Sequence, residues 1–173
     1  KLHACCHGTH AMIEALLSAE ISDLNEVATL EIQTNPRWLQ VCDLKAPRTG
    51  LEVKFSYGWL AGMALRGDST RDEATYSDAL AGDSTLCHFA RKVIVQGDAS
   101  LSDMQPRCLL TLRDGRVLKL SHDLAVPVPV EALAEKLRAK ANALIGDKAS
   151  QIWAFNDSSG KNARQIGDVI RAV

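Results

Sequence analysis

The segment RCLLTLRDGRVLKLSHD, residues 107–123, constrains the fold more than any other part of the sequence. Two apolar runs flank Asp114-Gly115, a pair that suits the positive backbone angles of a type I′ turn, so the segment predicts a β-hairpin. Alternating and β-branched residues predict two further strands, at 26–34 and 92–98. We therefore expect a sheet of about four strands.

Helices are predicted on either side of these strands. Thr9 is placed to cap a helix that buries Ile13, Leu16 and Leu17. Because helices and strands do not alternate regularly along the chain, as they do in all-parallel sheets, we expect an α+β fold. The other helices are expected from Ser56 to Gly67, at 70–78 and 83–90, at 130–146 with an apolar stripe of Leu133, Leu137, Ala141 and Leu144, and at 152–155 and 163–172.

Length and charge limit the classes of protein to which the chain can belong. Its 173 residues suffice for one domain, or for one domain with a short appended element. The net charge of −1 is spread along the chain, so we expect no nucleic-acid partner. No apolar run approaches the roughly 18 to 20 residues that span a bilayer, so we expect no membrane segment. Without a leader before Lys1, and with five cysteines in no framework spacing, a cytoplasmic location and reduced thiols are expected.

The N-terminal segment, residues 1–10 (KLHACCHGTH), concentrates a lysine, three histidines and two adjacent cysteines. The side chains of Cys5, Cys6 and His10 are of the types that bind zinc. A structural zinc site usually takes a second pair of ligands from elsewhere in the chain, and no such pair follows at a suitable spacing. The adjacent cysteines also lack the two-residue spacing of a thioredoxin-like redox pair. A carboxylate site is a third possibility, because free N–H groups at the helix start lie near Lys1. Alternatively, the histidines satisfy backbone groups and the cysteines are small buried apolar residues.

The basic segment, residues 45–56 (KAPRTGLEVKFS), places Lys45, Arg48 and Lys54 shortly before the helix start at Ser56. Together with the N-terminal segment it could hold carboxylates. The alternative is a charged face in contact with solvent, without a ligand.

Both segments resemble the two signatures of the C-terminal region of the MmgE/PrpD family, in the stretches KLHACCHGTH and APRTGLEVKFSYGWLAGMAL. Members include 2-methylcitrate dehydratase, cis-aconitate decarboxylase and iminodisuccinate epimerase. The resemblance implies a large helical domain and a smaller α/β lid domain, with a small di- or tricarboxylate between them and no metal or organic cofactor. It implies that residues 1–126 form the lid domain and that residues 127–173 return to a helical domain outside this chain.

Residue by residue, the resemblance assigns catalytic roles to Lys1 and His10, with Thr9 beside the histidine. Cys6 stands where some relatives place a histidine, and Trp59 stands where the decarboxylase branch can place a tyrosine, which argues against cis-aconitate decarboxylation. Such enzymes stabilise charge on a carboxylate or enolate and move a proton at the neighbouring carbon, which a lysine beside a helix start can assist. The expected substrate-binding residues are Thr9, Cys6, Arg48 and Lys54. For Arg48 and Lys54 the alternative is a structural ion pair.

The expected function is that of the lid part of a cofactor-independent lyase or isomerase, similar to 2-methylcitrate dehydratase. Its expected partners are a small polycarboxylate, the helical domain of the parent chain and a second copy in a homo-oligomer such as a dimer. The apolar stripe of Leu133, Leu137 and Leu144 favours such association. Two alternatives are a non-catalytic ligand-binding or interaction domain and a zinc-binding domain.

Overall fold

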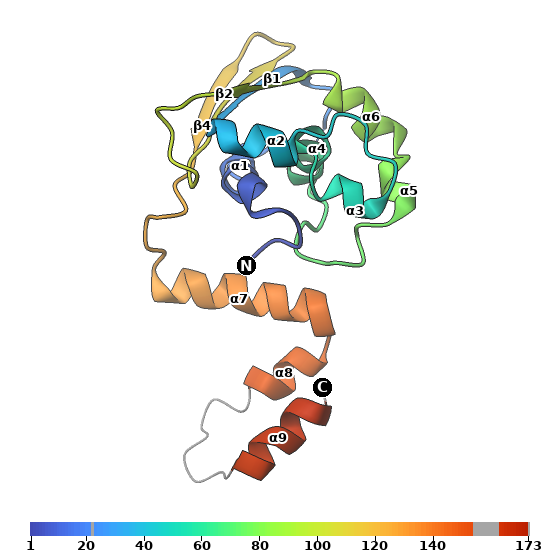
Figure 1. Cartoon of the computed structure of the whole chain (residues 1–173), viewed down its shortest axis with the longest axis vertical. Coiled ribbons are helices and arrows are strands. Elements are labelled where there is room, and N and C mark those ends of the chain that lie inside the picture. Colours follow the sequence, from blue (N-terminus) through green and yellow to red (C-terminus); the bar gives the residue numbers. More distant parts are fainter. Residues whose placement is uncertain (22, 154–162, 173) are drawn as a thin grey trace. The chain divides into compact units, whose positions relative to one another are not determined.

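The computed structural model describes residues 1–21, 23–153 and 163–172. The chain divides into two compact units, one containing Lys1 and His3–Pro127 and a second beginning at Val128 (Figure 1). Each unit is described by itself below. Among the described residues, no helix has the length and the apolar character needed to cross a membrane.

The first unit contains a four-stranded mixed sheet, which confirms the α+β fold and the expected number of strands. The strand order is β2-β1-β3-β4. Strand β1 pairs in parallel with β2 and antiparallel with β3, and β3 pairs antiparallel with β4. The strands are β1 (Val27–Thr34), β2 (Val93–Gly97), β3 (Arg107–Leu112) and β4 (Val117–Ser121).

The hairpin between β3 and β4 is present, but its turn is not the expected type I′. Gly115 has a φ of +89°, whereas Asp114 is not among the described residues with positive φ. Gly115 N–H donates to the Leu112 carbonyl at 3.1 Å, and Leu112 N–H donates to the Arg116 carbonyl at 2.8 Å. This pattern is a type I turn followed by a left-handed glycine, the usual three-residue hairpin loop. Only the glycine therefore needs the left-handed conformation.

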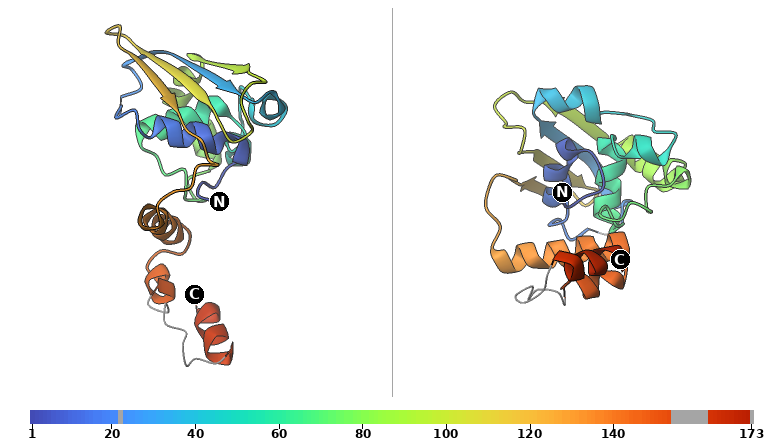
Figure 2. Two further views of the ribbon diagram at one scale, coloured as in Figure 1. Left: turned by 90° about the vertical axis from the view of Figure 1, so that its left-hand side faces the viewer. Right: turned by 60° about the horizontal axis from the view of Figure 1, so that its bottom comes forward.

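Helices α1 and α4 lie on one face of the sheet (Figures 1 and 2).

The prediction of a helix at 70–78 was wrong. Asp72 accepts a hydrogen bond from Ala74 N–H in a local turn, and α5 begins only at Asp78. Leu17 is 42% exposed because α1 ends at Leu16. The helical elements of this unit are η1 (His7–Thr9), α1 (His10–Leu16), η2 (Pro36–Trp38), α2 (Leu39–Cys42), α3 (Gly50–Val53), α4 (Tyr57–Arg66), α5 (Asp78–Ala81) and α6 (Ser84–Ala90).

The core lies between the sheet and these helices. Alternation along β1 and β3 directs one set of side chains inward, and α1 and α4 supply the facing apolar residues. The opposite face of the sheet carries polar and charged side chains such as Glu31 and Lys119 around a hollow of about 380 Å³. The largest fully buried side chains are those of Tyr57, Phe89, Met12, Ile13, Leu16, Leu30, Ile32, Leu60, Met63, Leu65, Leu86 and Leu110.

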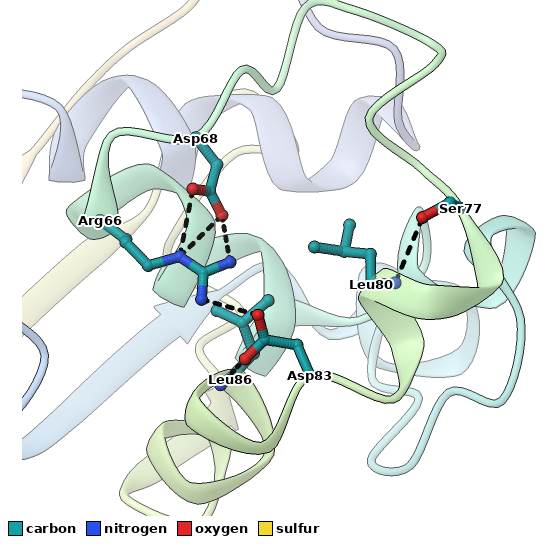
Figure 3. A network of polar contacts seen from close by, with 6 residues as sticks. All are labelled: Arg66, Asp68, Ser77, Leu80, Asp83 and Leu86. Carbon is teal, nitrogen blue, oxygen red and sulfur yellow. Dashed lines mark hydrogen bonds and ion pairs between the residues drawn. The ribbon is translucent and has the colours of Figure 1, made fainter.

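An ion-pair network fixes the end of α4 to the start of α6 (Figure 3). Arg66 Nη2 lies 2.6 Å from Asp68 Oδ2, and Arg66 Nη1 lies 2.9 Å from Asp83 Oδ2. Asp83 also accepts the N–H of Leu86 and so caps α6. As expected, α4 ends at Gly67, which has a φ of +84°.

The second unit consists of α7 (Val130–Ile145), α8 (Lys148–Trp153) and α9 (Ala163–Ala172). The amphipathic helix predicted at 130–146 and the one at 163–172 are confirmed. The helix predicted at 152–155 is represented by α8, and residues 154 and 155 lie outside the described residues. In α7 the stripe residues Leu133, Leu137 and Leu144 are 38%, 41% and 52% exposed.

Candidate active site

The N-terminal segment is held by backbone hydrogen bonds to two distant parts of the first unit. Ala4 N–H donates to the Thr70 carbonyl at 2.9 Å, and Cys6 N–H donates to the Lys54 carbonyl at 3.0 Å. The second bond joins the N-terminal segment directly to the basic segment. The structure thus brings the backbones of the two segments together, as the carboxylate-site hypothesis requires.

His3 has both ring nitrogens engaged in the interior. Its Nδ1 lies 2.7 Å from the Thr70 hydroxyl, and its Nε2 lies 3.0 Å from Oε1 of Glu14. The side chains of His3 and Glu14 are 0% and 6% exposed. The ring of His3 meets the ring of His10 edge-on, with centroids 4.9 Å apart and planes at 89°. His3 therefore connects a buried carboxylate to the predicted catalytic histidine.

His10 is the first residue of α1 and is only 3% exposed. Its ring lies between His3 and His7, whose ring centroid is 5.1 Å away. Its Nε2 is 3.4 Å from the Cys5 carbonyl, which can only accept, so Nε2 carries the proton in this contact. Burial, followed by the charge of His3, lowers the pKa of His10 to about 3. The imidazole is consequently neutral near pH 7.

Thr9 and the neighbouring cysteines lie next to the cluster formed by His3, His7 and His10. Thr9 stands at the start of α1, but its hydroxyl donates back to the Cys6 carbonyl at 2.8 Å and caps no N–H, contrary to the expectation. The Cys5 sulfur is 3.3 Å from the same hydroxyl, and burial raises the pKa of the Cys5 thiol. The half-buried Cys6 thiol lies within hydrogen-bonding reach of buried Cys42. In the structure all five cysteines are free thiols.

Lys1 is exposed at the start of the cluster. Its positive charge contributes, after burial and the two neighbouring histidines, to the lowered pKa of His10. The structure therefore places the Lys1 charge within electrostatic range of the His10 imidazole. These two are the predicted catalytic residues.

Arg48 and Lys54 are not part of this cluster. The Arg48 side chain is 87% exposed, and its guanidinium is 3.9 Å from the carboxylate of Glu52, one turn along the chain. Lys54 Nζ lies 3.0 Å from Oε1 of Glu73 and 5.1 Å from the ring centroid of Tyr76. The basic segment thus contributes its backbone to the site, through Lys54, while its charged side chains point to other partners.

The match to known families decides what kind of chain this is. The family model described as the MmgE/PrpD C-terminal domain matches residues 3–159. The chain belongs to the MmgE/PrpD family. No curated protein matches the chain. The family is dehydratase- and lyase-like and consists generally of enzymes. The matched range includes Cys6, Thr9, His10, Arg48 and Lys54 but begins two residues after Lys1.

The basic segment of this MmgE/PrpD domain is explained by backbone structure. The Thr49 hydroxyl accepts the N–H of Glu52 at 3.2 Å, and the Glu52 carboxylate accepts the N–H of Arg48. These bonds resemble a capping box at the start of α3. A Cβ on Gly50 would lie 1.9 Å from the Tyr76 carbonyl oxygen, so only glycine fits. Ser56 caps α4, as predicted.

Sequence reasoning missed several residues around the site. Glu14 follows His10 by four residues and so lies on the same helix face, a spacing that could have identified it. Thr70 had no such signal, because it reaches His3 across 67 residues. Tyr57 was also missed: its hydroxyl donates to the Gly8 carbonyl at 2.9 Å and holds η1 in place.

Two other features bear on the sequence hypotheses. Within residues 1–21, 23–153 and 163–172, no group of three or more His, Cys, Asp and Glu side chains is arranged to hold a metal ion. Trp59 is buried in α4, and its indole N–H has no hydrogen-bond partner among the described residues.

Proposed function

We propose that this chain is the lid-containing C-terminal part of a cofactor-independent lyase or isomerase that acts on a small di- or tricarboxylate, as 2-methylcitrate dehydratase does. The observation that carries the proposal is the environment of His10, a buried neutral imidazole between His3 and His7 and within range of the Lys1 charge. A cation beside a neutral base suits an anionic substrate that must lose a proton.

In this proposal the two predicted catalytic residues have different tasks. Lys1 is exposed and carries the charge that stabilises a substrate carboxylate or the enolate formed beside it. The contact between His10 Nε2 and the Cys5 carbonyl leaves Nδ1 as the ring nitrogen with a lone pair, suited to accept the proton from carbon. Because His10 is 3% exposed, its cover, which includes the exposed His7, moves aside when substrate enters the completed site.

The roles of the other predicted site residues are inferred from their contacts and from how far their side chains are exposed. Thr9 and Cys6 shape the wall beside His10 through the bond between them. Arg48 presents its guanidinium to solvent and is available to a substrate carboxylate, whereas Lys54 reaches substrate only by leaving Glu73. The residues that complete the site come from a helical domain of the same protein, and the exposed stripe of α7 packs within that domain or in a homo-oligomer. We propose a cytoplasmic location for this enzyme.

The test uses the complete protein that contains this chain. It is assayed with 2-methylcitrate, citrate, cis-aconitate and iminodisuccinate, first unchanged and then with Lys1→Met and His10→Gln. Each variant is expected to lower kcat/KM by about 100-fold or more, the usual scale for a lost acid–base or electrostatic group. Matched controls are Lys119→Met and His88→Gln, which change exposed residues of the sheet and of α6.

The controls should retain the rate of the unchanged protein. Unaltered rates in Lys1→Met and His10→Gln would overturn the assignment of the catalytic residues. Binding of these acids without turnover of any would favour the non-catalytic ligand-binding domain instead.

A further inference from the structure

The pair formed by Glu14 and His3 has no task in the chemistry described so far. Both side chains are almost completely buried, and Nε2 of His3 is 3.0 Å from Oε1 of Glu14. A buried carboxylate is costly unless it is paired and hydrogen-bonded, and the second nitrogen of His3 is likewise engaged, by Thr70 at 2.7 Å. An imidazole and a carboxylate at this distance can form an ion pair between a protonated histidine and an ionised glutamate.

We propose that Glu14 and His3 form a charged positioning pair that fixes the orientation of the His10 ring and keeps His10 in its neutral form. The pair acts through contact, because the His3 and His10 rings meet edge to face at a centroid distance of 4.9 Å. The value of this pair for catalysis rests on the function proposed above for His10. The existence of the charged pair does not.

In this proposal the positive charge on His3 is what connects the Glu14–His3 pair to the protonation state of His10. A positive charge about 5 Å away disfavours a second positive charge in the same buried space. His3 is, after burial, the largest cause of the lowered pKa of His10. Glu14 holds the proton on His3 and therefore acts on His10 indirectly. With His10 neutral, Nδ1 remains available as a proton acceptor well below pH 7.

The other titratable groups around His10 do not replace this pair. Lys1 and His7, on the same segment, add to the lowering of the His10 pKa. The other elements that pack against η1 and α1 present thiols and phenols, and burial raises the pKa of each, so they are uncharged near neutral pH. These groups are Cys42 of α2, Tyr57 of α4, Cys108 of β3 and Tyr76, which bonds to Cys5, whereas the inward residues Leu118 and Leu120 of β4 are apolar.

The test is nitrogen NMR of the histidine rings in the whole 173-residue chain between pH 4.5 and 8.5. In the unchanged protein, His3 is expected to show two protonated ring nitrogens at pH 7, and His10 a neutral ring that does not titrate above pH 5. In Glu14→Gln, which retains the size of the side chain without its charge, His3 should be neutral at pH 7. At pH 4.5 the protonated fraction of His10 should rise from about 3% to about a quarter, the change expected when its pKa rises by about one unit.

Glu31→Gln is the matched control, because Glu31 is an exposed carboxylate on β1, and it should leave the signals of both histidines unchanged. A neutral His3 ring at pH 7 in the unchanged protein would overturn the proposal, and that measurement does not depend on the folding of any variant. An unchanged protonated fraction of His10 at pH 4.5 in folded Glu14→Gln would overturn it as well. Failure of the proposed function, seen as no turnover of any acid, would leave these ring signals as predicted.

Discussion

The N-terminal segment and the basic segment look alike in the sequence, since both place cationic residues beside a helix start, yet the structure uses them differently. In the N-terminal segment, His3 and His10 turn inward and contact one another. In the basic segment, Arg48 faces solvent and Lys54 pairs with Glu73. The first segment thus builds a polar cluster, whereas the second builds a scaffold to which that cluster is attached.

The difference teaches that a charged residue near a helix start is not by itself directed at a ligand. The residue types that make the basic segment distinctive, Thr49, Gly50 and Glu52, are accounted for by a helix cap and a close approach of backbone. The buried side chains of His3 and His10 instead contact one another, and His3 also contacts the side chains of Thr70 and Glu14. Burial of polar groups is costly, so the N-terminal segment is the better candidate for function.

The largest expected effect tests the scaffold role of the basic segment. Gly50→Ala would place a Cβ 1.9 Å from the Tyr76 carbonyl oxygen, and the atoms in the way belong to the backbone, which cannot turn aside as a flexible side chain can. We expect a loss of about 3 kcal/mol or more in the free energy of unfolding, measured by urea denaturation. Gly82→Ala is the control, because the nearest atom to its Cβ is 3.6 Å away and its φ is −86°. Equal stability of the two variants would contradict the scaffold interpretation.

The second prediction concerns how the free energy of unfolding depends on pH, through the buried side chain of His10. His10 has a pKa lowered to about 3 in the folded chain, against an ordinary value of 6.5, so the unfolded chain binds a proton that the folded chain does not. The stability that neutral His10 provides is fully present above pH 6.5 and is lost as the pH falls toward 3. Between pH 6.5 and 5 the expected loss is about 2 kcal/mol.

The measurement is urea denaturation at several pH values, in the unchanged chain and in His10→Gln. Because other groups titrate in the same window, the difference between the two slopes isolates His10. The variant should lose less stability than the unchanged chain as the pH falls. Parallel curves would show that His10 is not held neutral by burial.

Local signals explain why much of the scaffold was predictable. Ser56 before a small-residue helix, Gly67 after it and Asp114-Gly115 between apolar runs each act within four residues, and each element formed where it was expected. The predicted type I′ turn of the hairpin was wrong. A three-residue loop also fits the twist of the two strands, and it needs only one left-handed residue, Gly115. The polar stretch at 70–78 was predicted helical, but side-chain bonds such as that of Asp72 favoured turns.

The polar cluster was predictable in position but not in organisation. The sequence places His3 and His10 close together, but it does not indicate that Thr70 and Glu14 would hold His3. Such contacts depend on which loop the fold brings against the segment. The same limit applies to Lys54, whose partner Glu73 is 19 residues away.

A third prediction separates structural from ligand-directed charge in the basic segment. The side chain of Lys54 is 17% exposed and pairs with Glu73, while its ammonium also lies over the Tyr76 ring. Lys54→Met should therefore cost about 1 kcal/mol in the free energy of unfolding at low salt. Lys45→Met is the matched control, since the Lys45 side chain is 65% exposed, and should cost less than about 0.5 kcal/mol. Equal losses would show that the Glu73 and Tyr76 contacts contribute nothing specific.

The smallest effect is expected at Arg48. Its guanidinium is 87% exposed and 3.9 Å from Glu52, so the ion pair is screened by solvent, and Arg48→Ala should change the free energy of unfolding by less than about 0.5 kcal/mol. Thr49→Ala, one residue away, removes a helix cap and should cost about 1 kcal/mol in the same urea titration. A larger loss in Arg48→Ala than in Thr49→Ala would make Arg48 part of the scaffold. With stability unchanged, a raised KM for the acid in the complete protein would report contact between Arg48 and substrate, and Arg48 would then be a residue of the site rather than of the scaffold.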